Sequence, residues 1–329
     1  MIRTQAGSDR LKSVPTFPLL LAVMLASLIG GVGCGRDEKP QGKTIGVTLL
    51  NRGHLFYRDL EEGLRKEAAI QGYAVVVTSA DFDLSKQIAQ VEDFLARKVD
   101  AIVMCPVDSR GVGPAIKKAN SVGIPVFTAD IAAQEGEVVS HIASDNVAGG
   151  RLAGEYLGNL LHGKGRVAII NQPAITSVLD RVKGFKEGIS KYPGIEIVSN
   201  VNGQGVRDKA MQAAADVLQA QPDLDGIFGI NDDSALGALD AVQQFGRNRI
   251  VIIGYDATPP ALEAIMNGTA LKADVVQYPE LIGRRTVETI GEFFAGRKLA
   301  KIIPVEVGIV DKGKLTNSKE AHVAKQPQQ

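Results

Sequence analysis

Short apolar runs alternate with amphipathic stretches along the chain from Thr44 onward. Ile88, Val91 and Leu95, for example, recur at helical spacing, whereas residues 101–104 are continuously apolar, as in a strand buried on both faces. The predicted helices span 56–70, 84–96, 112–120, 147–161, 177–190, 207–220, 234–245, 260–267 and 280–294. The predicted strands span 44–50, 75–79, 101–105, 125–128, 138–143, 166–171, 195–200, 226–230, 250–255, 271–277 and 303–310.

This alternation of strand and helix predicts a doubly wound α/β fold. Apolar strands of this kind need helices on both faces of a parallel sheet. So many strands would make one unusually large open sheet, since such sheets rarely exceed about ten strands. We therefore expect two parallel-sheet lobes.

The N-terminal segment has the pattern of an export signal. Residues 1–12 are basic, and the apolar run Leu19–Gly33 that follows is shorter than the roughly 20 residues of a membrane span. A buried core helix is the alternative, which the glycines of the run disfavour. The run ends in Gly31-Val-Gly-Cys34, which resembles a bacterial lipobox although Gly31 replaces the preferred Leu. We expect a signal peptide over 1–34 with lipidation at Cys34, or else ordinary cleavage and soluble export, and then a polar tether over 35–43.

The composition is globular and carries no charge bias. Lys plus Arg and Asp plus Glu number 37 each, and no basic run stands out, whereas nucleic-acid-binding proteins usually carry a basic surplus. The two cysteines, Cys34 and Cys105, make no disulfide framework, and the four histidines are scattered without the spacing of zinc ligands. We expect no nucleic-acid partner, no metal and no cofactor.

Polar and aromatic residues follow the predicted strands, where ligands bind in open α/β sheets. They suit a neutral polyhydroxyl ligand, because carboxylates accept and amides both donate and accept hydrogen bonds, while aromatic rings pack on the C–H face of a sugar. Alternatively, the Asp and Asn side chains cap the following helices. The candidates are Asn51, His54, Phe56, Tyr57, Ser79, Asp81, Cys105, Asp108, Asp130, Asn171, Asn200, Asn202, Asn231, Asp232, Asp233, Tyr255, Asp256 and Gln277.

Motifs for other chemistries are weak. Gly111-Val-Gly113 lacks the third glycine of a dinucleotide site and precedes Pro114. The run from Asp81 to Glu92 mimics a calcium loop but has Lys86 where that loop needs glycine. His54 could serve as a general base, but it has no paired nucleophile.

Longer segments carry a specific resemblance. They are Gly136–Asn146 with the glycines and alanines up to Gly154, Asn231–Leu239, and Gly254-Tyr-Asp-Ala-Thr-Pro259. On these segments the chain, from about Lys43 to Ile309, resembles the type I periplasmic sugar-binding proteins, the ribose-binding group in particular. The resemblance implies sugar-binding roles for Phe56, Tyr57, Asp130, Arg181, Asn231, Tyr255, Asp256 and Gln277.

Other positions depart from ribose recognition in that group. His54 and Cys105 stand where the family has asparagines, Leu50 replaces a polar residue, and Ile131 replaces an arginine. Gly205 stands in place of a stacking aromatic. We expect His54 to face the ligand still, and the ligand to be a sugar or sugar-like molecule, ribose-like or a related monosaccharide. Ribose itself should bind poorly unless other groups compensate, because an unpaired ligand hydroxyl costs about 1–3 kcal/mol.

The resemblance also implies a three-strand hinge and a transport role. The hinge is expected near 143–146, 277–279 and 307–310. It would join an N-terminal lobe (44–144 plus 278–306) to a C-terminal lobe (145–277 plus 307–313), with a flexible tail over 314–329. The lobes would close on the ligand, and the closed form, a monomer in the periplasm or cell envelope, would dock on the permease of an ATP-binding-cassette (ABC) transporter. The alternatives are a sugar sensor that feeds a chemoreceptor or kinase, an enzyme, and a LacI-type repressor core, which the export signal disfavours.

Overall fold

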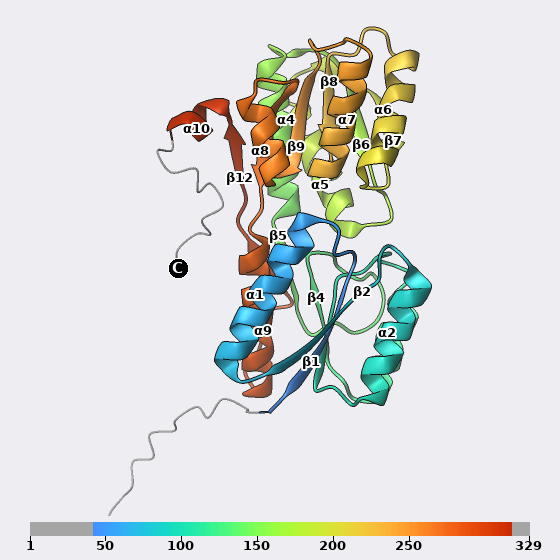
Figure 1. Cartoon of the computed structure of the whole chain (residues 1–329), viewed down its shortest axis with the longest axis vertical. Coiled ribbons are helices and arrows are strands. Elements are labelled where there is room, and N and C mark those ends of the chain that lie inside the picture. The colour runs from blue at the N-terminus through green and yellow to red at the C-terminus, as the bar shows by residue number, and fades with distance from the viewer. Residues whose placement is uncertain (1–41, 318–329) are drawn as a thin grey trace, which may run out of the picture. The chain divides into compact units, whose positions relative to one another are not determined.

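The fold comes from a computed structural model that describes residues 42–317. The predicted signal peptide, Cys34 and nearly all of the predicted tether lie outside the described residues, as do residues 318–329. No helix within 42–317 combines the length and the apolar character needed to cross a membrane. The described chain forms two lobes, each built on its own six-stranded sheet (Figure 1).

The first lobe holds a parallel sheet in the order β11-β5-β4-β3-β1-β2. Helices α1 and α9 pack together against one face of the sheet, and α2 and α3 pack together against the other. The strands are β1 (Thr44–Leu49), β2 (Ala74–Ser79), β3 (Ala101–Met104), β4 (Val126–Ala129), β5 (His141–Ser144) and β11 (Ile302–Val305). The helices are α1 (Leu55–Gln71), α2 (Leu84–Ala96), α3 (Gly113–Ser121) and α9 (Pro279–Phe294).

The second lobe repeats this strand order as β12-β10-β9-β8-β6-β7, with β12 antiparallel to β10. Helices α4 and α5 form a close pair, while α6, α7 and α8 cover the opposite face of the sheet. The strands are β6 (Lys164–Asn171), β7 (Gly194–Asn202), β8 (Gly226–Gly229), β9 (Val251–Asp256), β10 (Leu271–Val276) and β12 (Gly308–Asp311). The helices are α4 (Asn146–Leu160), α5 (Thr176–Ile189), α6 (Arg207–Ala220), α7 (Asp232–Gln244), α8 (Pro259–Met266) and α10 (Lys312–Asn317).

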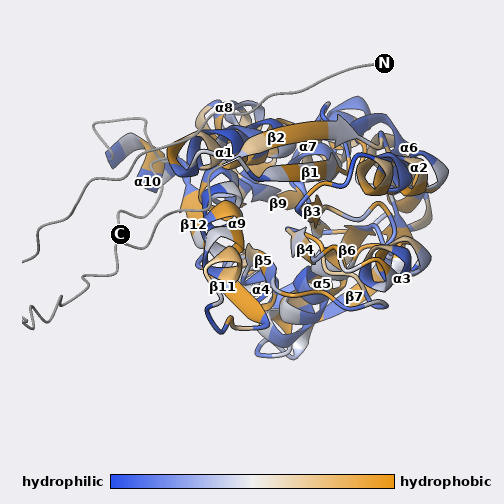
Figure 2. Ribbon diagram, turned by 90° about the horizontal axis from the view of Figure 1, so that it is seen from below, coloured by the Kyte–Doolittle hydropathy of each residue, from blue (hydrophilic) through white to orange (hydrophobic). Residues whose placement is uncertain are grey.

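Burial follows the hydrophobic pattern of the sequence. Strand β3 is buried along its whole length, as its continuous apolar run predicted. In Figure 2 the strands carry long orange stretches, whereas the helices carry both colours, as expected for helices with one face on the core. The α4–α5 pair is closely packed, because a Cβ at Gly150 would collide with the carbonyl oxygen of Arg181 and a Cβ at Gly184 with that of Val147. This close contact fixes the position of α5 against α4, and with it the position of Arg181.

The predicted fold class, two doubly wound lobes joined by a three-strand hinge, is confirmed. The chain passes between the sheets at Asp145, between β5 and α4; at 277–278, between β10 and α9; and at 306–307, between β11 and β12. The single strand predicted over 303–310 is wrong, because Glu306 and Val307 separate two strands that belong to different sheets. Hydrophobic periodicity records that a strand is extended but not which sheet it pairs with. The first residues of the predicted tail, 314–317, belong to α10.

Candidate ligand-binding site

A cavity lies between the lobes, beyond the carboxyl ends of the strands, with about 400 Å³ of empty space when the adjoining open solvent is included. In each sheet the first strand lies between the second and the third, so the strand order reverses there, and ligands bind in the crevice at such a reversal. The lining residues are Leu50, His54, Phe56, Tyr57, Asp130, Ile131, Gln172, Ile175, Ser177, Val178, Arg181, Ile230, Asn231, Asp256 and Gln277.

On the first lobe, the start of α1 supplies an aromatic wall and β4 supplies a carboxylate. The Phe56 and Tyr57 rings meet edge to face at 5.2 Å, and the Tyr57 hydroxyl donates a 2.7 Å hydrogen bond to Oδ2 of Asp130. Asp130 follows β4 with φ of 64°, a left-handed conformation that a non-glycine residue seldom adopts. Its buried Oδ1 has no partner among the described residues and is therefore free to accept from a ligand. Burial raises the pKa of Asp130, and the charge of Arg181 and the bond from Tyr57 oppose that rise.

On the second lobe, α5 carries a guanidinium that lines the cavity. Arg181 donates to Oδ1 of Asn146 and to the carbonyl of Ile230, both at 2.8 Å. Its guanidinium stacks over the ring of Tyr255 at 3.9 Å. These contacts leave Arg181 only 4% exposed and fix its orientation. Arg181 also lies 3.8 Å from Asp256, so a positive charge faces carboxylates of both lobes.

Asp256 ends β9, and Gln277 directly follows β10, the neighbouring strand of the second sheet. Gln277 Nε2 donates to Oδ1 of Asp256 at 2.6 Å, while Gln277 Oε1 is buried without a partner among residues 42–317. Asp256 has φ of 125°, again in the region that disfavours side chains. Burial raises the pKa of Asp256 to about 7; Arg181 opposes the shift, and the nearby Asp232 adds to it.

Three other predicted site residues have different placements. Asn231 lines the cavity, but its Oδ1 caps α7 by accepting from the Ser234 amide, and its Nδ2 donates to the Gly205 carbonyl. Tyr255 is fully buried behind Arg181 and does not line the cavity. His54 lines the cavity and reaches across it, with Nε2 2.9 Å from Oδ2 of Asp233.

The two lobes meet beside the cavity, so the structure is in a closed state. The Thr176 hydroxyl of the second lobe accepts from the Ala132 amide and donates to the Ala132 carbonyl, both at 3.0 Å. The Thr176 amide donates to Ser109 Oγ at 3.0 Å, and the Ser109 amide donates to the Ala174 carbonyl at 3.1 Å. These bonds and the His54–Asp233 pair connect the lobes directly.

Residues 45–298 match the family model described as a periplasmic binding protein domain. The chain belongs to the periplasmic binding proteins. It is 34% identical over 295 residues to the ribose import binding protein RbsB of Escherichia coli, a match that covers 89% of this chain and 97% of that protein. Two solved ABC transporter solute-binding proteins have TM-scores of 0.79. One, from Mycobacterium smegmatis with bound glycerol, is 31% identical, and the match covers 84% of this chain and 96% of that chain. The other, from Agrobacterium vitis with bound α-D-tagatopyranose, is 28% identical, and the match covers 84% of this chain and 97% of that chain.

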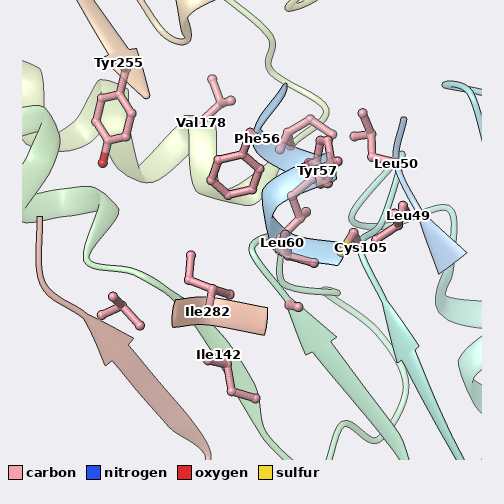
Figure 3. Close-up of a cluster of buried hydrophobic side chains, with 14 of the residues drawn as sticks. Leu49, Leu50, Phe56, Tyr57, Leu60, Cys105, Ile142, Val178, Tyr255 and Ile282 are labelled. Atoms are coloured by element: carbon pink, nitrogen blue, oxygen red, sulfur yellow. The ribbon is translucent and has the colours of Figure 1, made fainter. Parts of the chain in front are cut away.

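The family assignment confirms the predicted resemblance and sets the enzyme alternative aside, because these relatives are binding proteins. In the described part of the chain, no cluster of three His, Cys, Asp or Glu side chains could hold a metal ion. Cys105 is fully buried beside Tyr57 in the core (Figure 3), and burial raises the pKa of its thiol well above the usual value.

Several lining residues of this periplasmic binding protein were not predicted from the sequence. Gln172, Ile175, Ser177 and Val178 belong to the loop before α5 and its first turn, and Ile230 follows β8. Ser177 and Val178 precede Arg181 by four and three residues, so the helical repeat read backward from Arg181 places them on the same face. The helical spacing was therefore a usable signal for both, but Val178 is apolar and neither residue follows a strand.

The departures from ribose recognition make one side of the cavity apolar. Leu50 and Ile131 line it beside Phe56, and Val178 faces it from the second lobe. Figure 3 shows the Phe56 ring near Val178 and Leu50 near Tyr57. At Gly205, which has φ of 66°, a Cβ would collide with Oε1 of Gln172. Gln172 therefore occupies the space that a larger side chain at position 205 would need.

Proposed function

We propose that this periplasmic binding protein captures a neutral monosaccharide or polyol between its lobes and delivers it to the permease of an ABC importer. The family assignment implies an exported protein. The relatives' names support import: besides the ribose protein, they include a xylitol-binding protein and a D-apiose import binding protein. The near-complete coverage of the ribose import protein favours this function over the sensor alternative.

One observation carries the ligand class: two residues that line the cavity, one from each lobe, have a buried hydrogen-bond acceptor with no partner within residues 42–317. The acceptors are Oδ1 of Asp130 and Oε1 of Gln277. A buried acceptor left unpaired costs free energy, so the ligand must bring donors to both sides at once. Hydroxyl groups do this without adding charge. The guanidinium of Arg181 would repel a cationic ligand, and the carboxyl groups of Asp130 and Asp256 would repel an anionic ligand.

The apolar side of the cavity narrows the class further. Leu50 and Ile131 offer no hydrogen bond, so the hydroxyls of the ligand must be concentrated on the side that faces Asp130, Arg181 and Asp256. The Phe56 and Tyr57 rings can pack on a C–H face of the ligand. Ribose, which carries hydroxyls around its ring, is therefore expected to bind more weakly than the cognate ligand.

We assign the lobes as 44–144 plus 278–306 and 145–277 plus 307–313. Phe56, Tyr57, Asp130 and His54 would contact ligand from the first lobe, and Arg181, Asn231, Asp256 and Gln277 from the second, with Tyr255 acting through Arg181. Since only differential affinity shifts a conformational equilibrium, a ligand that bonds both lobes favours the closed state. That closed state would be the form that docks on the permease.

We further propose that Cys34 carries a lipid and that residues 35–43 tether a monomeric binding protein to the membrane. The lipobox-like run before Cys34 supports this anchor. Mass spectrometry of the membrane fraction would test it, with Cys34→Ser as the control. A mature N-terminus at a residue other than 34, without a lipid mass, would contradict it.

The ligand class is tested by thermal shift and calorimetry with ribose, xylitol, tagatose, allose, arabinose, myo-inositol and glycerol, beside charged amino acids and nucleotides. At least one neutral polyol should raise the melting temperature by mass action. Asp130→Asn should weaken its binding roughly 10- to 100-fold, because a hydrogen bond to a charged group is worth about 1.5–3 kcal/mol. Asp216→Asn, at an exposed position on α6, is the control. Tight binding of a charged ligand with no response to any polyol would overturn the proposal.

A further inference from the structure

Two carboxyl groups lie buried behind the turn that presents Asp256 to the cavity. Asp232 begins α7 and is 3% exposed, and Asp274 lies inside β10 and is 0% exposed. Oδ1 of Asp232 and Oδ2 of Asp274 are buried, and no N–H or O–H group of another described residue bonds either atom. The two side chains instead bond each other. A bond between two carboxyl oxygens requires a proton on one of them, so the pair holds one shared proton.

The remaining oxygens of the pair hold the turn from both sides. Oδ1 of Asp274 accepts from the Ala257 amide at 3.0 Å. Oδ2 of Asp232 accepts from the Thr258 amide at 2.6 Å and from the Thr258 hydroxyl at 2.5 Å. The two residues after Asp256 are thus bonded to the same carboxyl pair.

The turn needs such support because its backbone is strained. Asp256 has φ of 125° and Ala257 has φ of 58°, and two consecutive non-glycine residues in this region persist only where the surroundings hold them. The neighbouring strand leaves room for the pair: a Cβ at Gly254 would collide with Oδ2 of Asp274. An exposed turn could not keep this conformation without comparable contacts.

We propose that Asp232 and Asp274 are positioning residues that share a proton and hold the 256–258 turn so that the Asp256 carboxylate faces the ligand. This inference rests on the proposed function only for the identity of the ligand. Neither residue is among those that line the ligand cavity, although Asp232 lines an adjoining pocket that shares His54, Asn231 and Asp256 with it. The pair acts through the backbone amides of Ala257 and Thr258.

Several charged groups surround the pair and bear on its ionisation. Asp256 faces it from β9, Asp233 from α7, and Arg181 and His54 lie on the far side of Asp256. Burial raises the pKa of Asp274 well above its usual value, and the charge of Asp232 adds to that rise. This rise in the pKa of Asp274 favours retention of the shared proton. As the pH rises through the ionisation of the pair, the two charges repel each other and the turn is released.

Two substitutions at Asp274 separate positioning from simple packing. Asp274→Asn keeps an oxygen for the Ala257 amide and supplies a permanent N–H for Asp232, whereas Asp274→Ala removes both. The matched control is Asp225→Ala, which removes a carboxylate acceptor of the Arg166 amide at the other end of the second sheet. Folding of each variant is checked by circular dichroism.

The first readout needs no ligand: NMR measures amide exchange protection at Ala257 and Thr258, and the carboxyl ¹³C shifts of Asp232 and Asp274. In the wild type we expect protected amides and one proton between the carboxyls at pH 7. We expect Asp274→Ala to lose protection at least tenfold at both amides, and Asp274→Asn and Asp225→Ala to keep it. Equal loss in Asp274→Ala and Asp274→Asn, unchanged protection in both, or two ionised carboxyls at pH 7 would overturn the proposal.

The second readout is the Kd of the best neutral polyol from pH 6 to 10. Asp274→Asn should bind within about twofold of the wild type at pH 7.5, and Asp274→Ala at least tenfold more weakly. At the alkaline pH where the wild-type amides lose protection, the wild type should bind the polyol more weakly, whereas the affinity of Asp274→Asn should not change. A parallel decline in both would overturn the proposal. If no polyol binds the wild type, the proposed function fails, while the amide and carboxyl measurements still decide the role of the pair.

Discussion

The contact between His54 and Asp233, which joins the two lobes, predicts that ligand affinity depends on the protonation of His54. His54 belongs to the first lobe and Asp233 to the second, so their 2.9 Å contact exists only while the lobes are closed. Burial alone lowers the pKa of His54, but the hydrogen bond and charge of Asp233, with smaller contributions from Asp256 and Asp130, leave it above 6.5. The Tyr57 and Phe82 rings complete its surroundings.

The direction of the pH dependence follows from the linkage between proton binding and lobe closure. The closed state binds the His54 proton more tightly than a state without Asp233 nearby, so closure is favoured at low pH. This contribution is fully present below pH 6.5 and is lost as the pH rises through the raised pKa. Its size is modest, because the side chains are 16% and 36% exposed. We expect about 0.5–1 kcal/mol, which corresponds to about two- to fivefold in Kd.

Asp233→Asn tests this prediction best, because Asp233 does not line the ligand cavity. Calorimetry at pH 5.5, 7.0 and 8.5 would give Kd for the wild type, Asp233→Asn, His54→Gln and the double variant. Asp256 titrates in both proteins, so its effect on Kd cancels in the ratio of the Asp233→Asn Kd to the wild-type Kd. We expect that ratio to be two to five at pH 5.5 and close to one at pH 8.5, with a nonzero coupling in the double-mutant cycle at pH 5.5 only. A ratio that does not change with pH would refute the reasoning.

Three further predictions concern closure, stability and packing. Thr176→Val removes the hydroxyl that bonds both polar groups of Ala132, so Kd should rise roughly fivefold for about 1 kcal/mol, measured by calorimetry. Asp256→Asn should abolish polyol binding. It should also flatten the pH dependence of the melting temperature, because a native pKa of about 7, above the unfolded value, makes the wild type lose stability from pH 4 to 8. A wild type with no such loss would contradict this. Gly184→Val, whose Cβ would collide with the Val147 carbonyl, should cost about 1–3 kcal/mol in urea denaturation, and an unchanged midpoint would exclude the close α4–α5 contact.

The sequence predicted the lobes and most of the cavity for one physical reason. Strand and helix alternate strongly, and the parallel strands of one sheet bring their carboxyl ends to the same edge. Phe56 and Asp130 were therefore expected to meet at the first sheet, and Asp256 and Gln277 at the second. What periodicity could not reveal was the partner of each strand. The apolar run over 303–310 therefore hid the crossing at Glu306.

The roles of individual polar residues were harder to predict. Helix capping and a place in the cavity were weighed as alternatives for such residues, and Asn231 does both. Its Oδ1 accepts from the Ser234 amide at the start of α7, and the residue also lines the cavity. Tyr255 is fully buried under the Arg181 guanidinium and against Gly149 of α4, where a Cβ would collide with the Tyr255 hydroxyl, and the sequence pattern does not reveal this depth. Asp274 gave no signal at all, because an aspartate inside an apolar strand is explained only by its partner Asp232, 42 residues away in the sequence.

The most direct test is a crystal structure with the neutral polyol that binds best. The ligand should lie between the lobes with hydroxyl groups within hydrogen-bond distance of both Asp130 Oδ1 and the Asp256–Gln277 pair, and with Thr176 still bonded to Ala132. A ligand held by one lobe alone, or bound outside this cavity, would contradict the account.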